Sequence, residues 1–158
     1  MLSTCKSCGT ALVAGPRQER TARTAQFEVT VREIPAQVCP RGCPGHYGQW
    51  PTLGIECLSL LRSLSGRMAR RKLGFFRVRL LCPQCRVELT DRGRRNEFAA
   101  RGPAESGQPV ELAVVARCLT CPRCELDVLP GQTAASGEYY RELSEAISEA
   151  VTRDFIWT

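Results

Sequence analysis

Residues 116–126 read ARCLTCPRCEL, and within this stretch Cys118, Cys121 and Cys124 form two overlapping C-x-x-C units. A C-x-x-C turn lets two sulfurs face one point, so two such turns complete the four-sulfur shell of a structural zinc. Nine of the ten cysteines lie in close clusters: Cys5/Cys8, Cys39/Cys43, Cys82/Cys85 and Cys118/Cys121/Cys124. The early and the late pair of clusters form a doubled pattern, which predicts two structural Zn²⁺ ions.

The first predicted site consists of Cys5, Cys8, Cys39 and Cys43. Its second turn has the spacing C-x3-C, which structural zinc sites tolerate. His46 follows Cys43 by three residues and is an alternative ligand.

The second predicted site consists of Cys82, Cys85 and two members of the opening trio. The β-rich run before Cys118 favours Cys118/Cys121, whereas CPRCELDVL resembles CPQCRVEL and favours Cys121/Cys124. We favour Cys121/Cys124, because proline after the first cysteine preforms the bend of the turn. Cys118 stays an alternative ligand.

Two other uses of the cysteines compete with zinc. An iron–sulfur cluster of the bacterial ferredoxin type needs a further cysteine where this chain has Val128. Disulfides need an oxidising compartment, and the sequence shows no signal peptide and no membrane span. We therefore expect a cytoplasmic protein without membrane contact, whose reduced thiols bind metal.

Apolar periodicity supplies the remaining elements. Phe27, Val29 and Val31 alternate with polar residues as in a half-buried strand, and β-rich runs also lead into Cys82 and Cys118. The expected fold is a small, metal-dominated α+β protein, with two zinc-ribbon-like β modules joined by an amphipathic helix and followed by a C-terminal helix. The expected divisions are 1–50 (zinc finger), 51–73 (connecting helix), 74–130 (second ribbon) and 131–158 (linker and acidic helix). Modules of this size bury little core, so metal is expected to provide most of the folding free energy.

Two helices are predicted in more detail. Residues 52–72 carry apolar side chains at i, i+3 and i+4 spacing, with Cys57 on the apolar stripe as a buried hydrophobe and Gly74 as the stop. The C-terminal helix is expected to begin after Ser136 as its cap. This helix is expected to carry an apolar stripe that either docks a partner or covers the second ribbon. The stripe consists of Tyr139, Tyr140, Leu143, Ile147, Ala150 and Val151.

The amino-terminal part, about residues 1–70, resembles the YgiT-type zinc finger of MqsA-like bacterial antitoxins. The shared features are Cys5-x-x-Cys8-Gly9, the run FEVTVREIPAQVC ending at Cys39, and a following helix. The resemblance implies a structural zinc in a protein-binding module, which in the antitoxins contacts the toxin while a separate helix-turn-helix half reads DNA. This chain has CPRGCP as its second turn and a second ribbon in place of the helix-turn-helix, so the DNA-reading role does not carry over.

Function is therefore expected to be binding. The formal charge of +6 would fall to about +2 with eight thiolates and two zinc ions, so net charge alone does not indicate nucleic acid. The first hypothesis is a non-catalytic double zinc-ribbon adaptor for a protein partner in a bacterial toxin, defence or transcription assembly. The alternative is nucleic-acid binding through a basic segment with Phe75 and Phe76: Arg62, Arg67, Arg70, Arg71, Lys72, Arg77 and Arg79. With one histidine and no nucleotide-binding loop, neither an enzyme nor a small-molecule substrate is expected.

Overall fold

The computed structural model describes residues 3–48, 50–102, 109–131 and 138–157. The first half contains β1 (Val13–Ala14), β2 (Gln18–Arg23), β3 (Phe27–Ile34), β4 (Gln37–Val38), β5 (His46–Gly48) and α1 (Trp50–Ser65). A hairpin of β6 (Arg70–Leu73) and β7 (Val78–Leu81) follows. The second half contains β8 (Arg95–Arg101), β9 (Glu111–Arg117), β10 (Leu119–Thr120), β11 (Asp127–Val128), α2 (Glu138–Thr152) and β12 (Phe155–Trp157). The protein is thus a small α+β fold in which strands outnumber helices.

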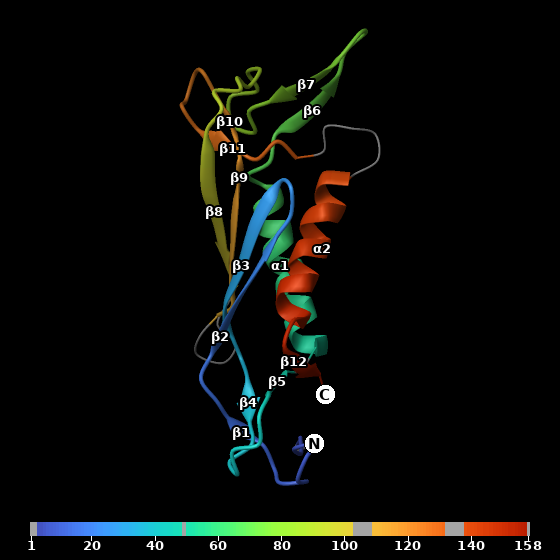
Figure 1. The fold of residues 1–158 in the computed structure, drawn as a ribbon. Coiled ribbons are helices and arrows are strands. Elements are labelled where there is room, and N and C mark those ends of the chain that lie inside the picture. The colour runs from blue at the N-terminus through green and yellow to red at the C-terminus, as the bar shows by residue number, and fades with distance from the viewer. Residues whose placement is uncertain (1–2, 49, 103–108, 132–137, 158) are drawn as a thin grey trace.

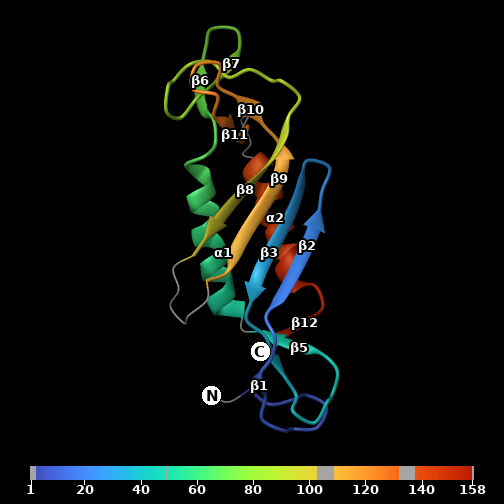
Figure 2. The same ribbon diagram turned by 90° about the vertical axis from the view of Figure 1, so that its left-hand side faces the viewer.

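The centre of the molecule is a four-stranded antiparallel sheet with the order β2-β3-β9-β8 (Figure 2). Its two middle strands come from different halves of the chain, with Phe27 opposite Ala116 and Val31 opposite Leu112. These side chains are buried, as the alternating pattern of β3 predicts. The expected boundary near residue 73 falls in the β6–β7 hairpin, and strands from both sides of it share this sheet.

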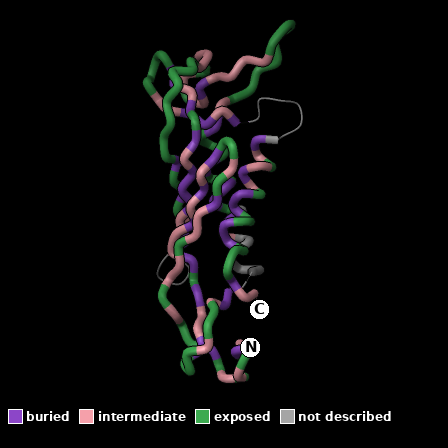
Figure 3. The backbone as a smooth tube through the Cα atoms, viewed as in Figure 1, coloured by how far each residue is buried: buried purple, intermediate pink, exposed green. Residues whose placement is uncertain are grey.

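Both helices lie on the same face of the central sheet (Figures 1 and 2). The helix α1 packs on β8 and β9, and α2 packs on β2 and β3. One hydrophobic core therefore contains Leu60 and Leu64 of α1 together with Leu143 and Ile147 of α2. The two halves thus pool their apolar faces in one core, and buried positions run along the central sheet (Figure 3).

The two halves repeat the same order of elements. Each contains a turn with two cysteines, a hairpin of the central sheet, a second turn with two cysteines, and a helix. The first turns match in detail: the Cys5 amide donates to the Thr10 carbonyl at 2.8 Å, and the Cys82 amide to the Val87 carbonyl at 2.9 Å. The doubled cysteine pattern therefore reflects a repeated fold, with the antiparallel pair β3–β9 at its centre.

The halves also exchange their last elements. Each helix covers the hairpin of the other half, and the chain after each helix pairs in parallel with the other half. After α2, β12 pairs with β5, and after α1, Met68 pairs with Leu129. Each half therefore depends on the other to cover its hairpin and to complete its end.

The structure differs from the sequence expectation at one helix end. The helix expected over 52–72 ends at Ser65, and 70–73 form the strand β6. The amides of Arg67 and Met68 bond to the carbonyls of Leu64 and Ser65 in tight turns, after which Met68 pairs with Leu129. Pairing with the other half thus overrides the helical periodicity.

Some of the other strands and helices were predicted from the sequence and some were not. The strands β2 and β8 were not predicted, although β3, β9 and the C-terminal helix were. The expected cap Ser136 lies outside the described residues.

Candidate metal centres

Two groups of four cysteines lie at opposite ends of the molecule. The first group, Cys5, Cys8, Cys39 and Cys43, lies at the end formed by β1, β4 and β5 (Figure 1). The second group, Cys82, Cys85, Cys121 and Cys124, lies at the end formed by β10 and β11. Within each group, all four Sγ atoms lie within 4.8 Å of one another.

The distances between sulfurs suit a tetrahedral metal ion. Four sulfurs about 2.3 Å from a zinc ion lie about 3.8 Å from one another, whereas a disulfide brings two sulfurs to about 2.05 Å. The Sγ atoms of Cys8 and Cys39 are 3.5 Å apart, and those of Cys82 and Cys124 are 3.8 Å apart. All ten cysteines are free of disulfides. The donor set and spacing therefore fit two tetrathiolate zinc sites.

Hydrogen bonds to the sulfurs hold both groups in place. In the first group, the Tyr47 hydroxyl donates to Cys5 Sγ at 3.5 Å. In the second, Cys82 Sγ accepts from the Cys85 amide at 3.4 Å and Cys121 Sγ from the Cys124 amide at 3.5 Å. Such donors orient ligand sulfurs and favour their thiolate form.

Within each group, thiols differ in pKa. The hydrogen bond from Tyr47 lowers the pKa of Cys5 to about 6, and the backbone amide of Cys124 lowers that of Cys121 to about 7. In contrast, hydrogen bonding to the Cys8 sulfur raises the pKa of Cys43 to about 12, and the Cys124 sulfur does the same for Cys85. Four thiolates at one point repel one another, so only a bound cation allows all four to be ionised.

The two alternative ligands lie outside these groups. Cys118 is buried in the shared core, and its thiol points to the Arg94 carbonyl at 3.6 Å. Burial raises its pKa. His46 lies on β5 with its ring 6.3 Å from the Phe155 ring. The structure therefore brings together the favoured Cys121/Cys124 pair and leaves Cys118 as a core residue.

Cys57 lies on the core side of α1, as its place in the apolar stripe predicts. Burial raises the pKa of this thiol to about 12, which keeps it protonated at neutral pH. A buried neutral thiol is a small hydrophobe rather than a nucleophile.

The basic residues of the nucleic-acid hypothesis lie on the end of α1, on the turn after it and on the β6–β7 hairpin. Arg62 lies on the last turn of α1, and Arg67 stacks on the Phe98 ring at 5.1 Å. Arg70, Arg71 and Lys72 are exposed on β6. On β7 and its turn, Arg79 and Arg77 each form an ion pair with Glu88 at 3.2 Å.

Among the helices within the described residues, none has both the length and the apolar character needed to cross a bilayer. Comparisons with protein-family models, with curated proteins and with solved structures give no match for this chain.

Proposed function

We propose that the protein is a non-catalytic adaptor, held by two structural zinc ions, that binds an acidic partner protein through its β6–β7 hairpin. The observation that supports this proposal is the exposure of large apolar side chains at the tip of the hairpin. Phe75 and Phe76 are 100% and 99% exposed, and Leu73 is 74% exposed. Exposed apolar side chains gathered at one point mark sites of interaction.

The hairpin is built so that its tip stays defined without contact to the core. Leu73 pairs with Val78, and the Gly74 amide donates to the Arg77 carbonyl at 2.9 Å, which closes a tight turn. Phe75 and Phe76 occupy the middle of this turn. The hairpin projects beyond β10 and β11 (Figure 1), and its β6 strand is exposed along its whole length (Figure 3).

The charge of the hairpin selects the kind of partner. Residues 58–81 contain no acidic side chain, and β6 presents three exposed cations at Arg70, Arg71 and Lys72. Arginine and aromatic residues are enriched among those that dominate binding energy at protein interfaces. A pocket that accepts two phenyl rings and has an acidic rim complements this surface.

The C-terminal helix is not available as a second docking surface. Its apolar stripe is buried in the shared core, with Leu143, Ala150 and Val151 fully enclosed. The alternative in which the stripe covers the second ribbon is wrong about the covered element, because α2 packs on the hairpin β2–β3 of the first half. Deleting the helix would remove core rather than test binding.

The zinc ions are proposed to act structurally. A metal that catalyses keeps a coordination position open for water or substrate, whereas four cysteines fill the tetrahedral shell. The resemblance of the amino-terminal part to an antitoxin module and a cytoplasmic location stay part of this proposal, in which a zinc-held scaffold binds another protein. A bacterial toxin, defence or transcription assembly stays the proposed setting.

Replacing both Phe75 and Phe76 with alanine is expected to weaken partner binding about 100-fold, because two buried phenyl rings contribute about 3 kcal/mol together. A photo-crosslinking amino acid at position 76 in the source cells identifies the partner, and calorimetry with the purified pair measures the affinity. The matched control is Val13→Ala, which removes an exposed apolar side chain at the other end of the molecule. Equal affinities for the wild type and the double variant would refute the proposal.

Single-stranded nucleic acid is the second candidate, because exposed rings beside arginines can stack on bases. In that case the crosslink at position 76 forms with nucleic acid, and affinity for a labelled oligonucleotide falls steeply as salt rises. A crosslink to protein alone, with no salt-dependent oligonucleotide binding, removes this candidate.

A further inference from the structure

The strand β8 forms one free edge of the central sheet. It lies at the margin of the sheet, with α1 on the far face (Figure 2), and within the described residues no strand pairs with its outer side. At one end of the β8–β9 ladder, the Gly102 amide donates to the Val110 carbonyl at 3.1 Å. Since bonded positions alternate in an antiparallel pair, the even-numbered residues of β8 bond to β9 and the odd-numbered residues direct their amides and carbonyls outward. The outward residues are Arg95, Glu97, Ala99 and Arg101.

The two edges of the central sheet differ in regularity. The opposite edge strand, β2, has a register shift between Gln18 and Arg20. Such an irregularity bends an edge strand and discourages further pairing. In contrast, the register of β8 is continuous from Arg95 to Arg101, and its four outward residues are all exposed. The edge of β8 is thus a regular template for one more strand.

The charges along this edge fit a second copy of the same strand. If two β8 strands pair antiparallel about Ala99, Glu97 of each copy lies opposite Arg101 of the other. Opposite charges at such positions stabilise a strand pair, and like charges destabilise it. Pairing about Phe98 would instead place Arg95 opposite Arg101 of the second copy. Pairing about Glu97 would place two glutamates opposite each other.

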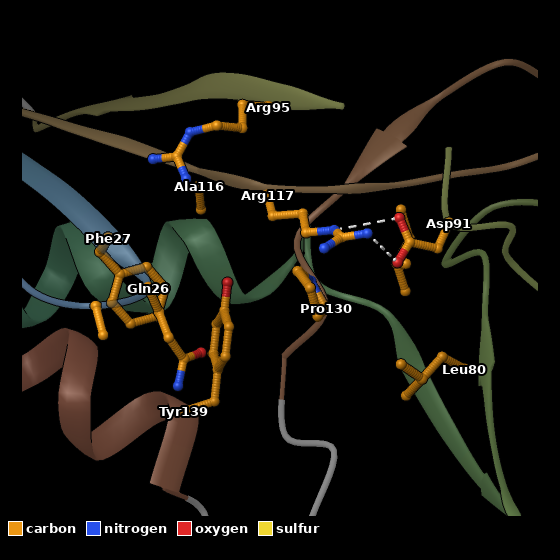
Figure 4. A pocket seen from close by; sticks show the side chains of 11 residues that line it. Gln26, Phe27, Leu80, Asp91, Arg95, Ala116, Arg117, Pro130 and Tyr139 are labelled. Carbon is orange, nitrogen blue, oxygen red and sulfur yellow. Dashed lines mark hydrogen bonds and ion pairs between the residues drawn. The ribbon is translucent and has the colours of Figure 1, made fainter. Parts of the chain in front are cut away.

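The start of β8 adds to the case against pairing about Phe98. Arg95 already lies opposite Arg117 of β9, and Arg117 forms an ion pair with Asp91 at 2.9 Å (Figure 4). Pairing about Phe98 would therefore place three arginines in one row across the joined sheets. Pairing about Ala99 leaves Arg95 outside the central pairs and avoids this row.

The two charged residues of the edge are held only weakly within one chain. Glu97 lies 3.8 Å from Arg32, and Arg101 lies 3.7 Å from Glu111. Exposed ion pairs of this kind contribute little to stability, so both side chains can turn to a second copy. The Glu97 amide donates to the Asn96 side-chain oxygen at 2.8 Å, and strand pairing would exchange this bond for one to the second copy.

We propose that the protein forms a symmetric dimer in which β8 pairs antiparallel with β8 of a second copy, centred on Ala99. Glu97 and Arg101 form two equivalent ion pairs across the dimer axis. The outward amides and carbonyls of 97, 99 and 101 bond between the copies, and two four-stranded sheets become one continuous sheet. This inference is independent of the function proposed for the hairpin.

Sedimentation velocity of the intact zinc-loaded protein tests the dimer. We expect reversible dimerisation with a Kd below about 100 µM. Glu97→Arg and Arg101→Glu are each expected to weaken dimerisation at least tenfold, since each places like charges opposite one another at two equivalent positions. The double variant is expected to recover the wild-type Kd within about threefold. Because the two residues lie about 13 Å apart along one strand, this recovery requires contact between copies.

The matched control is Glu19→Arg on the other edge strand, β2. Glu19 is exposed and contacts Arg32 at 3.4 Å, as Glu97 also contacts Arg32, and its replacement is expected to leave the Kd unchanged. Ala99→Pro removes the central outward amide but no bond to β9, and it is expected to abolish the dimer. The proposal is overturned if the wild type is monomeric at about 100 µM or if Ala99→Pro still dimerises. It is equally overturned if the single charge variants dimerise as well as the wild type, or if the double variant fails to recover the affinity.

Discussion

Replacing Cys121 with serine is expected to remove one of two bound zinc ions and to unfold the protein, beginning at the end that contains β10 and β11. A structural zinc contributes about 10–16 kcal/mol in small zinc modules, whereas a whole domain is stable by about 5–15 kcal/mol. Loss of one site therefore removes stability comparable to that of the entire fold. Metal analysis and thermal unfolding of the purified variant measure the two effects.

Cys118→Ala is the matched control for this prediction. Both cysteines are buried and three residues apart, but the structure places the Cys118 sulfur in the shared core and outside the second cysteine group. The alanine variant is expected to keep two zinc ions and to lose only about 1 kcal/mol through its smaller side chain. A Cys118 variant that loses zinc while the Cys121 variant keeps it would reverse the assignment.

Replacing Leu143 with alanine is expected to destabilise the protein by about 2–5 kcal/mol, the usual cost of this truncation in a packed core. Leu143 is fully buried where α2, from the second half, covers the hairpin of the first half. Because this core is shared, β3 and β9 are expected to lose amide protection together. Denaturant unfolding gives the free energy, and hydrogen exchange followed residue by residue gives the location.

The comparison variant is Arg141→Ala on the exposed side of the same helix. Among the described residues, Arg141 forms only a surface ion pair with Glu145, in which both side chains are largely exposed. Its loss is therefore expected to change stability by less than about 0.5 kcal/mol. If Leu143→Ala opened β2 and β3 while β8 and β9 kept full protection, the halves would be separate folding units and the shared core would be refuted.

The sequence predicted the features that depend on local pattern. Cysteine spacing indicated two groups of four, and the proline rule favoured the pair Cys121/Cys124 that the structure brings together. Alternation in β3 and the apolar stripe of α2 were also recognised, because each buries one regular face.

The features that depend on distant pairing were missed. The strand β2, with the sequence QERTAR, has Ala22 as its one fully buried residue, so its strand character comes from its pairing with β3. A signal for its counterpart was present, since β8 begins as far after Cys82 as β2 begins after Cys5. The exchange of helices between halves leaves no local pattern, because an apolar stripe does not specify which hairpin it covers.

The exposed tip of the β6–β7 hairpin is a further feature that could not be predicted from the sequence. Phenylalanine is usually buried, so the sequence alone does not show that Phe75 and Phe76 lie at the surface. The structure exposes both rings almost completely. An apolar residue that contradicts the burial rule is a signal of interaction, but the contradiction is visible only when the fold is known.

We propose two tetrathiolate zinc sites at opposite ends of one shared sheet. Native mass spectrometry of the purified protein, followed by elemental analysis, tests this claim most directly. We predict two zinc ions per chain and ten cysteines without a disulfide. A chain that carries fewer than two metal ions, or whose clustered cysteines are joined by disulfides, would contradict the account.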